Sequence, residues 1–150
     1  MRVVIQRVKE ASVTVENKVL SKIGLGFLIL LGVETEDTKE DISWLVGKTA
    51  RLRVFSDEND AMNKSIIDIK GDIIVVSQFT LHASTKKGNR PSFIKAARPE
   101  VAIPLYEAFV HQLEKEIGKK IQTGMFGAMM DVKLVNDGPV TIVIDSKQRE

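Results

Sequence analysis

Cysteine is absent from the 150-residue chain. This absence excludes a disulfide framework, a thiolate nucleophile and a cysteine-ligated zinc ion. It also fits a reducing compartment, so the sequence predicts a cytoplasmic protein. No metal site is predicted, because the acidic run "DEND" at residues 57–60 lacks the spacing of a calcium-binding loop and is typical of a turn.

Long apolar segments are also missing. The longest, "GLGFLILLGV" at residues 24–33, is half the length of a membrane-spanning helix, which needs about 20 residues. Arg2, Arg7 and Lys9 interrupt the apolar residues at the N-terminus, which excludes the hydrophobic region of a signal peptide. We therefore expect a soluble, intracellular protein with no membrane partner.

Charge of one sign is not in large excess, since the formal net charge is +2. A nucleic-acid partner must therefore be inferred from local clustering and not from overall charge. Hydrophobic residues make up 43% of the chain and charged residues 28%, as in ordinary globular proteins. Repeats and flexible linkers are lacking too, so residues 1–150 are predicted to form a single domain with its own core.

Alternating apolar residues predict strands at both ends of the chain. Residues 1–24 are expected to form a hairpin that turns at residues 16–18. Residues 26–33 are apolar on both faces, which predicts a central strand. Residues 65–81 are predicted to form two strands joined at residues 70–72. The last third returns to strands, with Gly138-Pro139 separating the final two.

Apolar residues at helical spacing predict two helices. The first begins after Thr38, a residue type that caps helices, and extends to about Leu52. The second begins at Pro99 and ends near Gly118. Because strands surround two helices without regular alternation, the predicted fold class is α+β with a largely antiparallel or mixed sheet.

The stretch "IIVVSQFTL" at residues 73–81 begins as a buried strand but ends on polar side chains. A continuous strand would place Ser77 and Phe79 on one face, with Gln78 and Thr80 on the other. A buried hydroxyl or amide without a partner costs about 1–3 kcal/mol. Either a neighbouring loop or a ligand therefore satisfies these groups, and the residues alone leave both readings open.

Nucleophilic catalysis lacks the partners that it needs. A Thr80 nucleophile requires a nearby base, and the nearest candidate, His82, would lie about 6.6 Å away along a strand. His111 falls within the second predicted helix, where a solvated position is favoured. With no Ser/His/Asp triad, an enzyme of this sequence is expected to work by positioning, by backbone dipoles or by a group that the substrate brings.

A basic segment follows the polar strand end. Five cations lie within thirteen residues: Lys86, Lys87, Arg90, Lys95 and Arg98. Residues 73–99 contain no acidic side chain. Solvated loop charges are one interpretation, and contacts to the phosphates of RNA or DNA are the other. The position of the cations beside the polar strand end favours a reaction on a nucleic-acid end.

Four motifs occur in order along the chain: "SQFTL" at 77–81, "KKGNRPSF" at 86–93, "TGMFGAMM" at 123–130 and "NDGPVT" at 136–141. With "VVIQRV" near the start, they make the sequence similar to the D-aminoacyl-tRNA deacylase family from Met1 to about Ser146. The resemblance implies hydrolysis of the ester between a D-amino acid and the terminal adenosine of tRNA, and clearance of glycine mischarged on tRNA for alanine. It also implies a homodimer with the active site where the subunits meet, acting on the 3′ end of aminoacyl-tRNA without a cofactor.

The resemblance assigns the catalytic pocket to the first motif. Thr80, Gln78 and Phe79 are the expected catalytic residues, and Ser77 lines the same pocket. The backbone of Gln78 and Phe79 is expected near the substrate amino group and carbonyl. The ribose 2′-hydroxyl is implied as the activating group in place of a Thr80 nucleophile. His82 stands where many relatives have an aromatic such as Tyr, so packing beside the pocket and catalysis both remain open.

The remaining roles implied by the resemblance lie outside that motif. Gly138 and Pro139 match a Gly-cisPro motif whose carbonyls project into the neighbouring subunit's pocket and exclude an L side chain. Arg7 is similar to the arginine that holds this motif, and Phe126 and Gly127 are similar to the segment that borders the adenosine. The expected phosphate contacts are Lys86, Lys87 and Arg90.

Two other functions remain open at this point. A non-catalytic module that binds RNA ends would use the basic loop without needing the pocket or Gly138-Pro139. A hydrolase of small acyl esters would use Thr80 as a true nucleophile and would be indifferent to the basic loop.

Overall fold

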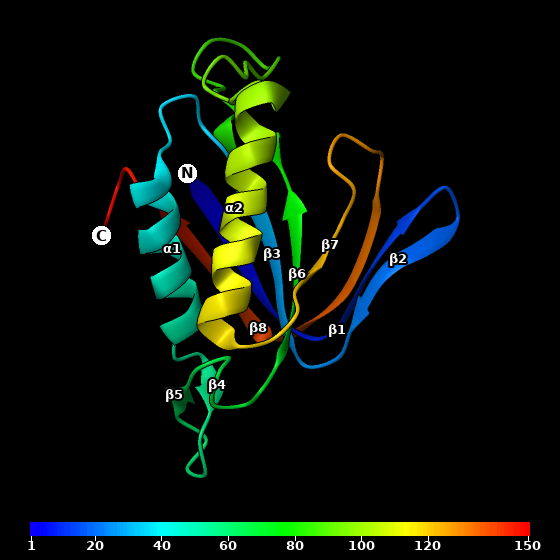
Figure 1. Ribbon diagram of the computed structural model, residues 1–150, viewed down its shortest axis with the longest axis vertical. Helices are drawn as coiled ribbons and strands as arrows, with labels where there is room; N and C mark the ends of the chain where they lie inside the picture. The colour runs from blue at the N-terminus through cyan, green and yellow to red at the C-terminus, as the bar shows by residue number, and fades with distance from the viewer.

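Strand β1 (Arg2–Val15) is the central element of the fold in this computed structural model, which describes residues 1–150. It pairs antiparallel with β2 (Lys18–Ile23), β3 (Gly26–Gly32) and β8 (Asp131–Asp145). Beyond β3, the sheet continues with β6 (Asp72–Ser77) and β7 (Gln122–Thr123), both parallel to their neighbours. The order is β2-β1-β3-β6-β7, with β8 also paired to β1 (Figure 1). The predicted α+β class with a mixed sheet is confirmed.

The hairpin at the start of the chain turns where the sequence predicts. Glu16 and Asn17 have positive φ angles of 47° and 63°, as a tight two-residue hairpin turn requires. β1 is long enough to pair with β3 through Arg2–Val8 and then with β2 through Ala11–Val15. The predicted turn at residues 57–60 is also confirmed, between the short strands β4 (Phe55–Ser56) and β5 (Met62–Lys64).

A glutamine side chain brings the two ends of the sheet order together. Gln122 in β7 accepts a hydrogen bond from the Lys22 N–H and donates one to the Lys22 carbonyl, both at 2.8 Å. Ser21 adds a hydrogen bond from its hydroxyl to the carbonyl of Thr123. Because the Gln122 amide takes the place of a ladder partner, the sheet is nearly closed.

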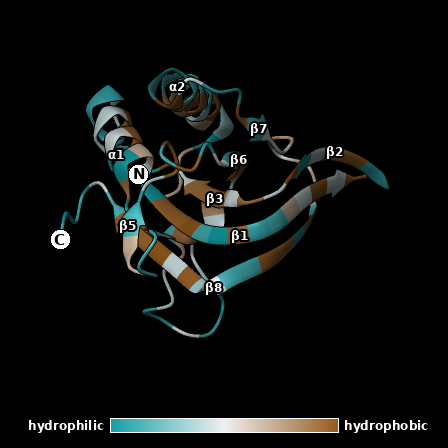
Figure 2. Ribbon diagram, turned by 90° about the horizontal axis from the view of Figure 1, so that it is seen from below, coloured by the Kyte–Doolittle hydropathy of each residue, from teal (hydrophilic) through white to brown (hydrophobic).

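Helices α1 (Lys39–Arg51) and α2 (Pro99–Ile117) both lie on one face of the sheet (Figure 2). The larger core fills the space between the sheet and these two helices and includes Phe27, Ile29 and Leu31 from β3. Leu28 points to the opposite face, where a smaller core forms with residues of β1, β2 and β6. None of the helices has the length and apolar composition of a membrane-spanning segment.

Both helices start where the sequence predicts. The Thr38 hydroxyl accepts a hydrogen bond from the Glu40 N–H at 3.3 Å, while Asp41 accepts one from the Thr38 N–H at 2.8 Å. These reciprocal bonds cap α1 at its first turn. Pro99 occupies the first turn of α2, and Gly118 ends that helix in the left-handed conformation with φ of 67°.

The prediction of two strands in residues 65–81 is wrong. Residues 66–70 form turns, and Asp68 accepts hydrogen bonds from the N–H and hydroxyl of Ser65 at 2.8 and 2.7 Å. This local side-chain bonding competes with a strand ladder, so the apolar residues Ile66 and Ile67 do not start a strand. Only β6 remains, and it stops at Ser77.

The prediction that Gly138-Pro139 separates two strands also needs correction. β8 runs through this pair as one strand. Its pairing with β1 jumps, however, from Val8 opposite Asn136 to Gln6 opposite Thr141. Residues 137–140 therefore bulge out of the ladder beside Arg7, and the Gly138-Pro139 peptide bond is cis.

Candidate active site

A mostly apolar cavity of about 350 Å³ opens at the carboxyl ends of β3 and β6. Ser77, Gln78 and Phe79 line one side of it, while Phe126 and Gly127 line another. The structure therefore brings together five of the residues predicted for the site, from two segments about fifty positions apart. The rest of the lining is Leu31, Val33, Val76, Ala97, Ala102, Ala128, Met129, Met130 and Val132.

The chain leaves the strand geometry at the polar end of β6. Residues Phe79–His82 form a short 3-10 helix, η1, and not the continued strand that alternation predicts. The Gln78 N–H still pairs with the Leu31 carbonyl at 2.8 Å, after which the Leu81 N–H bonds back to the Gln78 carbonyl at 3.3 Å. The N–H groups of Phe79 and Thr80 lie in the first turn of η1. At this position a helix provides no carbonyl acceptor of its own for an N–H group.

The predicted polar residues are less buried than a continuous strand would make them. Ser77 and Gln78 are half-buried, and Thr80 is exposed and does not line the cavity. The Gln78 amide donates a hydrogen bond to the Thr80 hydroxyl. Most of the desolvation expected for these groups is therefore absent, because the turn at Phe79 moves them to the rim of the cavity.

Neither histidine is placed to activate Thr80. His82 is 95% buried, with Nε2 lacking a hydrogen-bond partner, and it packs beside Gly32 of β3. The Thr80 hydroxyl is hydrogen-bonded to Gln78 and not to His82. His111 is exposed on α2, as predicted. Of the two readings left open for His82, the structure favours an interior packing role.

An aromatic pair holds the second wall of the cavity. Phe126 meets the ring of Tyr106 edge-on, with 5.9 Å between ring centroids. The Tyr106 hydroxyl donates to the Val75 carbonyl of β6 at 2.8 Å, and burial raises the pKa of Tyr106 well above its ordinary value of 10. Tyr106 therefore stays neutral, and it ties Phe126 to the strand that ends at the cavity. Sequence reasoning missed Tyr106 because its helix position is typical of a core residue.

The basic loop is attached to the rim of the same cavity. It rises beyond the N-terminal end of α2 (Figure 1), and Ser84 and Ser92 close it with two main-chain hydrogen bonds of 2.8 and 2.9 Å. Just after this closure, Phe93 contacts Phe79 edge-on, with 5.0 Å between ring centroids. The three predicted phosphate contacts, Lys86, Lys87 and Arg90, are exposed and form no ion pair.

Arg7 and Gly138 lie together but away from this cavity. The Arg7 Nε donates to the Asp137 carbonyl at 3.2 Å, and a β-carbon on Gly138 would lie 2.9 Å from Arg7 Nη2. Arg7 is opposite Phe27 in the β1–β3 ladder, whereas the cavity begins at Leu31. Four residues of strand separate the two positions by about 13 Å. The site residues of one chain therefore form two separate groups.

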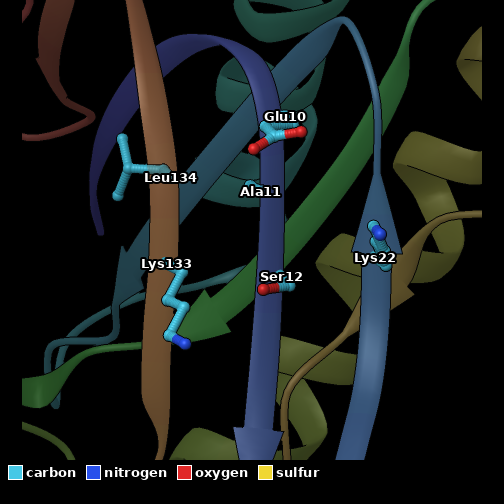
Figure 3. Close-up of a pocket in the computed structure, with 6 residues that line it drawn as sticks. All are labelled: Glu10, Ala11, Ser12, Lys22, Lys133 and Leu134. Carbon is cyan, nitrogen blue, oxygen red and sulfur yellow. The ribbon is translucent and has the colours of Figure 1, made fainter.

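A second hollow lies over β1, β2 and β8 and contains none of the predicted residues. Glu10, Ser12, Lys22 and Lys133 border it from three neighbouring strands, together with Ala11 and Leu134 (Figure 3). Its volume is about 210 Å³, and its charged side chains of both signs are all at the surface. This hollow has no buried polar group to bind a ligand, so the larger cavity is the stronger candidate.

Comparisons with known proteins agree with the motifs. Residues 4–145 match the model of the family described as D-Tyr-tRNA(Tyr) deacylase. Proteins named D-aminoacyl-tRNA deacylase from Flavobacterium johnsoniae and Parabacteroides distasonis are 68% and 58% identical over the full length of both chains.

Solved structures show the same architecture. That of a c-Myc DNA Unwinding Element Binding Protein is 44% identical, with a TM-score of 0.90 over 97% of this chain and 98% of the other. That of a probable eukaryotic D-amino acid tRNA deacylase is 19% identical, with a TM-score of 0.82 over 95% and 97%, which shows the shared fold. With the family match covering nearly the whole chain, the protein belongs to the D-Tyr-tRNA(Tyr) deacylase family.

Proposed function

We propose that this protein hydrolyses the ester bond of D-aminoacyl-tRNA and releases the free D-amino acid and tRNA. The observation that carries the proposal is the contact between Phe79 and Phe93, which joins the catalytic turn to the basic loop. Through this contact, a cavity of amino-acid size and three unpaired cations lie on one continuous surface. An aminoacyl ester at the 3′ end of a tRNA fits this surface, because the cavity can hold the amino acid and the cations can contact the phosphates.

The reaction relies on main-chain groups and on the substrate. The N–H groups of Phe79 and Thr80 donate hydrogen bonds to the ester carbonyl oxygen and stabilise the negative charge that develops on it. Water, activated by the ribose 2′-hydroxyl, adds to the carbonyl carbon. The bond to the 3′ oxygen then breaks, and that oxygen takes up a proton. Thr80 orients the substrate and does not attack it, because no base contacts its hydroxyl.

Chirality is read by exclusion. A D and an L amino acid carry the same groups, so they are separated only when the amino group, the carbonyl and the α-hydrogen are all held in place. Rigid backbone in the direction of an L side chain then rejects it by overlap, at little cost to the correct substrate. Glycine has no side chain to collide, so glycyl-tRNA is also a substrate.

The excluding backbone is Gly138-Pro139 of a second copy of the chain. Within one chain, Phe27, the ladder partner of Arg7, lies about 13 Å along β3 from Leu31 at the edge of the cavity. The Gly138-Pro139 loop beside Arg7 therefore does not reach the cavity of its own chain. Two apolar residues that line the cavity are also well exposed, Phe79 by 55% and Met129 by 92%, and Ile94, which follows Phe93 in the chain, is 91% exposed. Exposed apolar patches of this kind mark interaction sites, and a homodimer covers this one.

The first experiment follows the loss of the ester from D-Tyr-tRNA and L-Tyr-tRNA. Rapid hydrolysis of the D form and persistence of the L form are expected. Binding of D-Tyr-tRNA without release of tyrosine would contradict the proposal and indicate an RNA-binding module. Equal cleavage of D-tyrosine methyl ester would indicate a hydrolase of small esters.

Mixed dimers test delivery from the second copy. One subunit carries Ala128→Trp, which fills its own cavity, and the other carries Gly138→Ala. The only open cavity then faces an unaltered Gly138-Pro139 loop from its neighbour, so the mixed dimer is expected to be selective, whereas the Gly138→Ala homodimer is not. A mixed dimer that cleaves L-Tyr-tRNA as readily as that homodimer would rule out action between subunits.

A further inference from the structure

The carbonyl of Leu81, at the end of η1, is bound by an arginine from the first strand. Arg2 Nη1 donates to this carbonyl at 2.6 Å. The same guanidinium donates from Nε and Nη2 to one carboxylate oxygen of Asp145, at 2.9 and 2.7 Å. Because the planar guanidinium is held on both sides, its position is fixed, and it holds the Leu81 carbonyl in turn.

Gly32 supports the same turn from β3. A β-carbon built on Gly32 would lie 3.0 Å from both the Gln78 carbonyl oxygen and the Leu81 β-carbon. The turn therefore rests directly on the Gly32 backbone, where a β-carbon would fit only if the turn moved by a few tenths of an ångström. Arg2 and Gly32 are also direct partners in the β1–β3 ladder. One cross-strand pair thus contacts the turn at two places.

The turn itself has little internal support. It is a four-residue 3-10 helix, whose hydrogen bonds have poorer geometry than those of an α-helix. The bonds that define it are the 3.3 Å contact from Leu81 to Gln78 and a 3.1 Å contact from the Ala83 N–H to the Thr80 carbonyl. Phe79 and Thr80 are exposed, so burial does not hold them in place. External contacts must supply the rigidity that catalysis needs.

We infer that Arg2 and Gly32 are positioning residues for the reaction. They fix η1 relative to β3 and so set where the Phe79 and Thr80 N–H groups meet the ester carbonyl. Neither residue lines the cavity, so both act through the turn and not on the substrate. The inference rests on the proposed function, because the position of these N–H groups matters only when an ester is bound.

Arg2 substitutions separate positioning from general stability. Arg2→Met is expected to lower kcat on D-Tyr-tRNA by up to about 100-fold, the cost of misplacing a reacting group by about 1 Å. KM should stay within about twofold, since the basic loop that binds tRNA is untouched. Arg2→Lys keeps the charge but not the two-sided hold on the carbonyl and the carboxylate, so an intermediate kcat is expected.

Two further variants sharpen the comparison. Gly32→Ala pushes the turn away from β3 and is expected to lower kcat as Arg2→Met does. Lys9→Met is the matched control, because it removes an exposed cation from the same strand and should leave kcat unchanged. An Arg2→Met enzyme with the kcat of the control, or one that changes KM alone, overturns the inference.

Amide hydrogen exchange tests the inference without an activity measurement. The amides of Leu81 and Ala83 are expected to exchange faster in Arg2→Met and Arg2→Lys than in Lys9→Met. Equal exchange in all three would overturn the inference even with an active enzyme. An unaltered protein that fails to hydrolyse D-Tyr-tRNA would instead refute the proposed function, and the exchange data would still show whether Arg2 holds the turn.

Discussion

Arg7 and Asp137 are joined twice. The Arg7 Nε donates to the Asp137 carbonyl at 3.2 Å and lies 3.1 Å from the Asp137 carboxylate. The Arg7 Nη1 also donates to the Val54 carbonyl, and the arginine is 91% buried. The bulge that carries Gly138-Pro139 is therefore fastened to β1 by one buried side chain.

Arg7→Met should destabilise the protein and loosen this bulge. Removal of one partner from a buried ion pair costs about 3–5 kcal/mol, and the partial exposure of Asp137 places the loss near the lower value. Urea unfolding measures the change. The ratio of D-Tyr-tRNA to L-Tyr-tRNA cleavage is also expected to fall, since the proposed excluding backbone loses its anchor. Arg53→Met, at an exposed arginine without an ion pair, should change neither quantity.

Gly138→Ala is expected to reduce chiral selectivity while the rate on D-Tyr-tRNA changes only a few-fold. Gly138 has φ of 120°, which L residues rarely adopt, and its β-carbon would lie 2.9 Å from both Arg7 Nη2 and Val140 Cγ2. The loop must therefore shift. Gly118→Ala is the matched control, because Gly118 also has a positive φ but open space around it. Full selectivity in Gly138→Ala would show that the loop does not read chirality.

Thr80→Ala should slow hydrolysis far less than loss of a true nucleophile, which costs about 10⁶-fold in kcat. The Thr80 hydroxyl is hydrogen-bonded to the Gln78 amide and has no base beside it. A tRNA that ends in 2′-deoxyadenosine should, in contrast, be cleaved much more slowly. Single-turnover kinetics on both substrates test this, and a trapped acyl-Thr80 species would disprove it.

Neutralising the basic loop should weaken tRNA binding and flatten its dependence on salt. Removing one cation that binds a phosphate lowers the log-log slope by about 0.7–0.9. The triple substitution of Lys86, Lys87 and Arg90 by alanine should therefore show a clear change in binding titrations, while selectivity persists because cations that bind phosphates do not read the amino acid. The control removes three exposed lysines elsewhere: Lys9, Lys18 and Lys39. An equal slope change in both variants would mean that the loop has no special role.

Asp41 should make the stability dependent on acid pH. Burial raises the pKa of Asp41, but hydrogen bonds from Ser146, Lys147 and Thr38 outweigh it and hold the pKa well below the ordinary 3.8. Because the folded-state pKa is depressed, the Asp41 carboxylate stabilises the fold at pH values above the unfolded-state pKa of about 3.9. This contribution to stability is lost as the pH falls toward the folded-state pKa.

Asp41→Asn is expected to lower the free energy of unfolding at pH 7 by about 2 kcal/mol, the range for a hydrogen bond to a charged group. The difference from the unaltered protein should narrow below pH 4, where that protein also loses the contribution. Urea titrations across the pH range measure both effects. Asp131→Asn, at an exposed aspartate without an ion pair, should show neither, and a difference for Asp41→Asn that is constant with pH would contradict the assignment.

Much of the fold was predictable because its signals are local. Thr38 and Pro99 start the two helices, and Glu16 and Asn17 make the first hairpin turn, each through chemistry contained in a few neighbouring residues. Apolar residues at Ile66 and Ile67 led to a wrong strand prediction, since the competing bonds of Ser65 and Asp68 are not visible in the alternation. The mostly apolar lining of the cavity was not predicted either, because pocket and core residues have the same composition.

Residue patterns along the chain were enough to establish the α+β class, the order of most elements and, through motifs at 77–81, 86–93, 123–130 and 136–141, the family. The assembly of the site, in contrast, became visible only in three dimensions. There β6 ends at Ser77, Phe126 lies against the same cavity and Gly138 stays apart from it. These arrangements depend on contacts such as those of Arg2 with Leu81 and Asp145, 79 and 143 positions away. No local pattern of side chains encodes which distant carbonyl or carboxylate a guanidinium will meet once the sheet has formed.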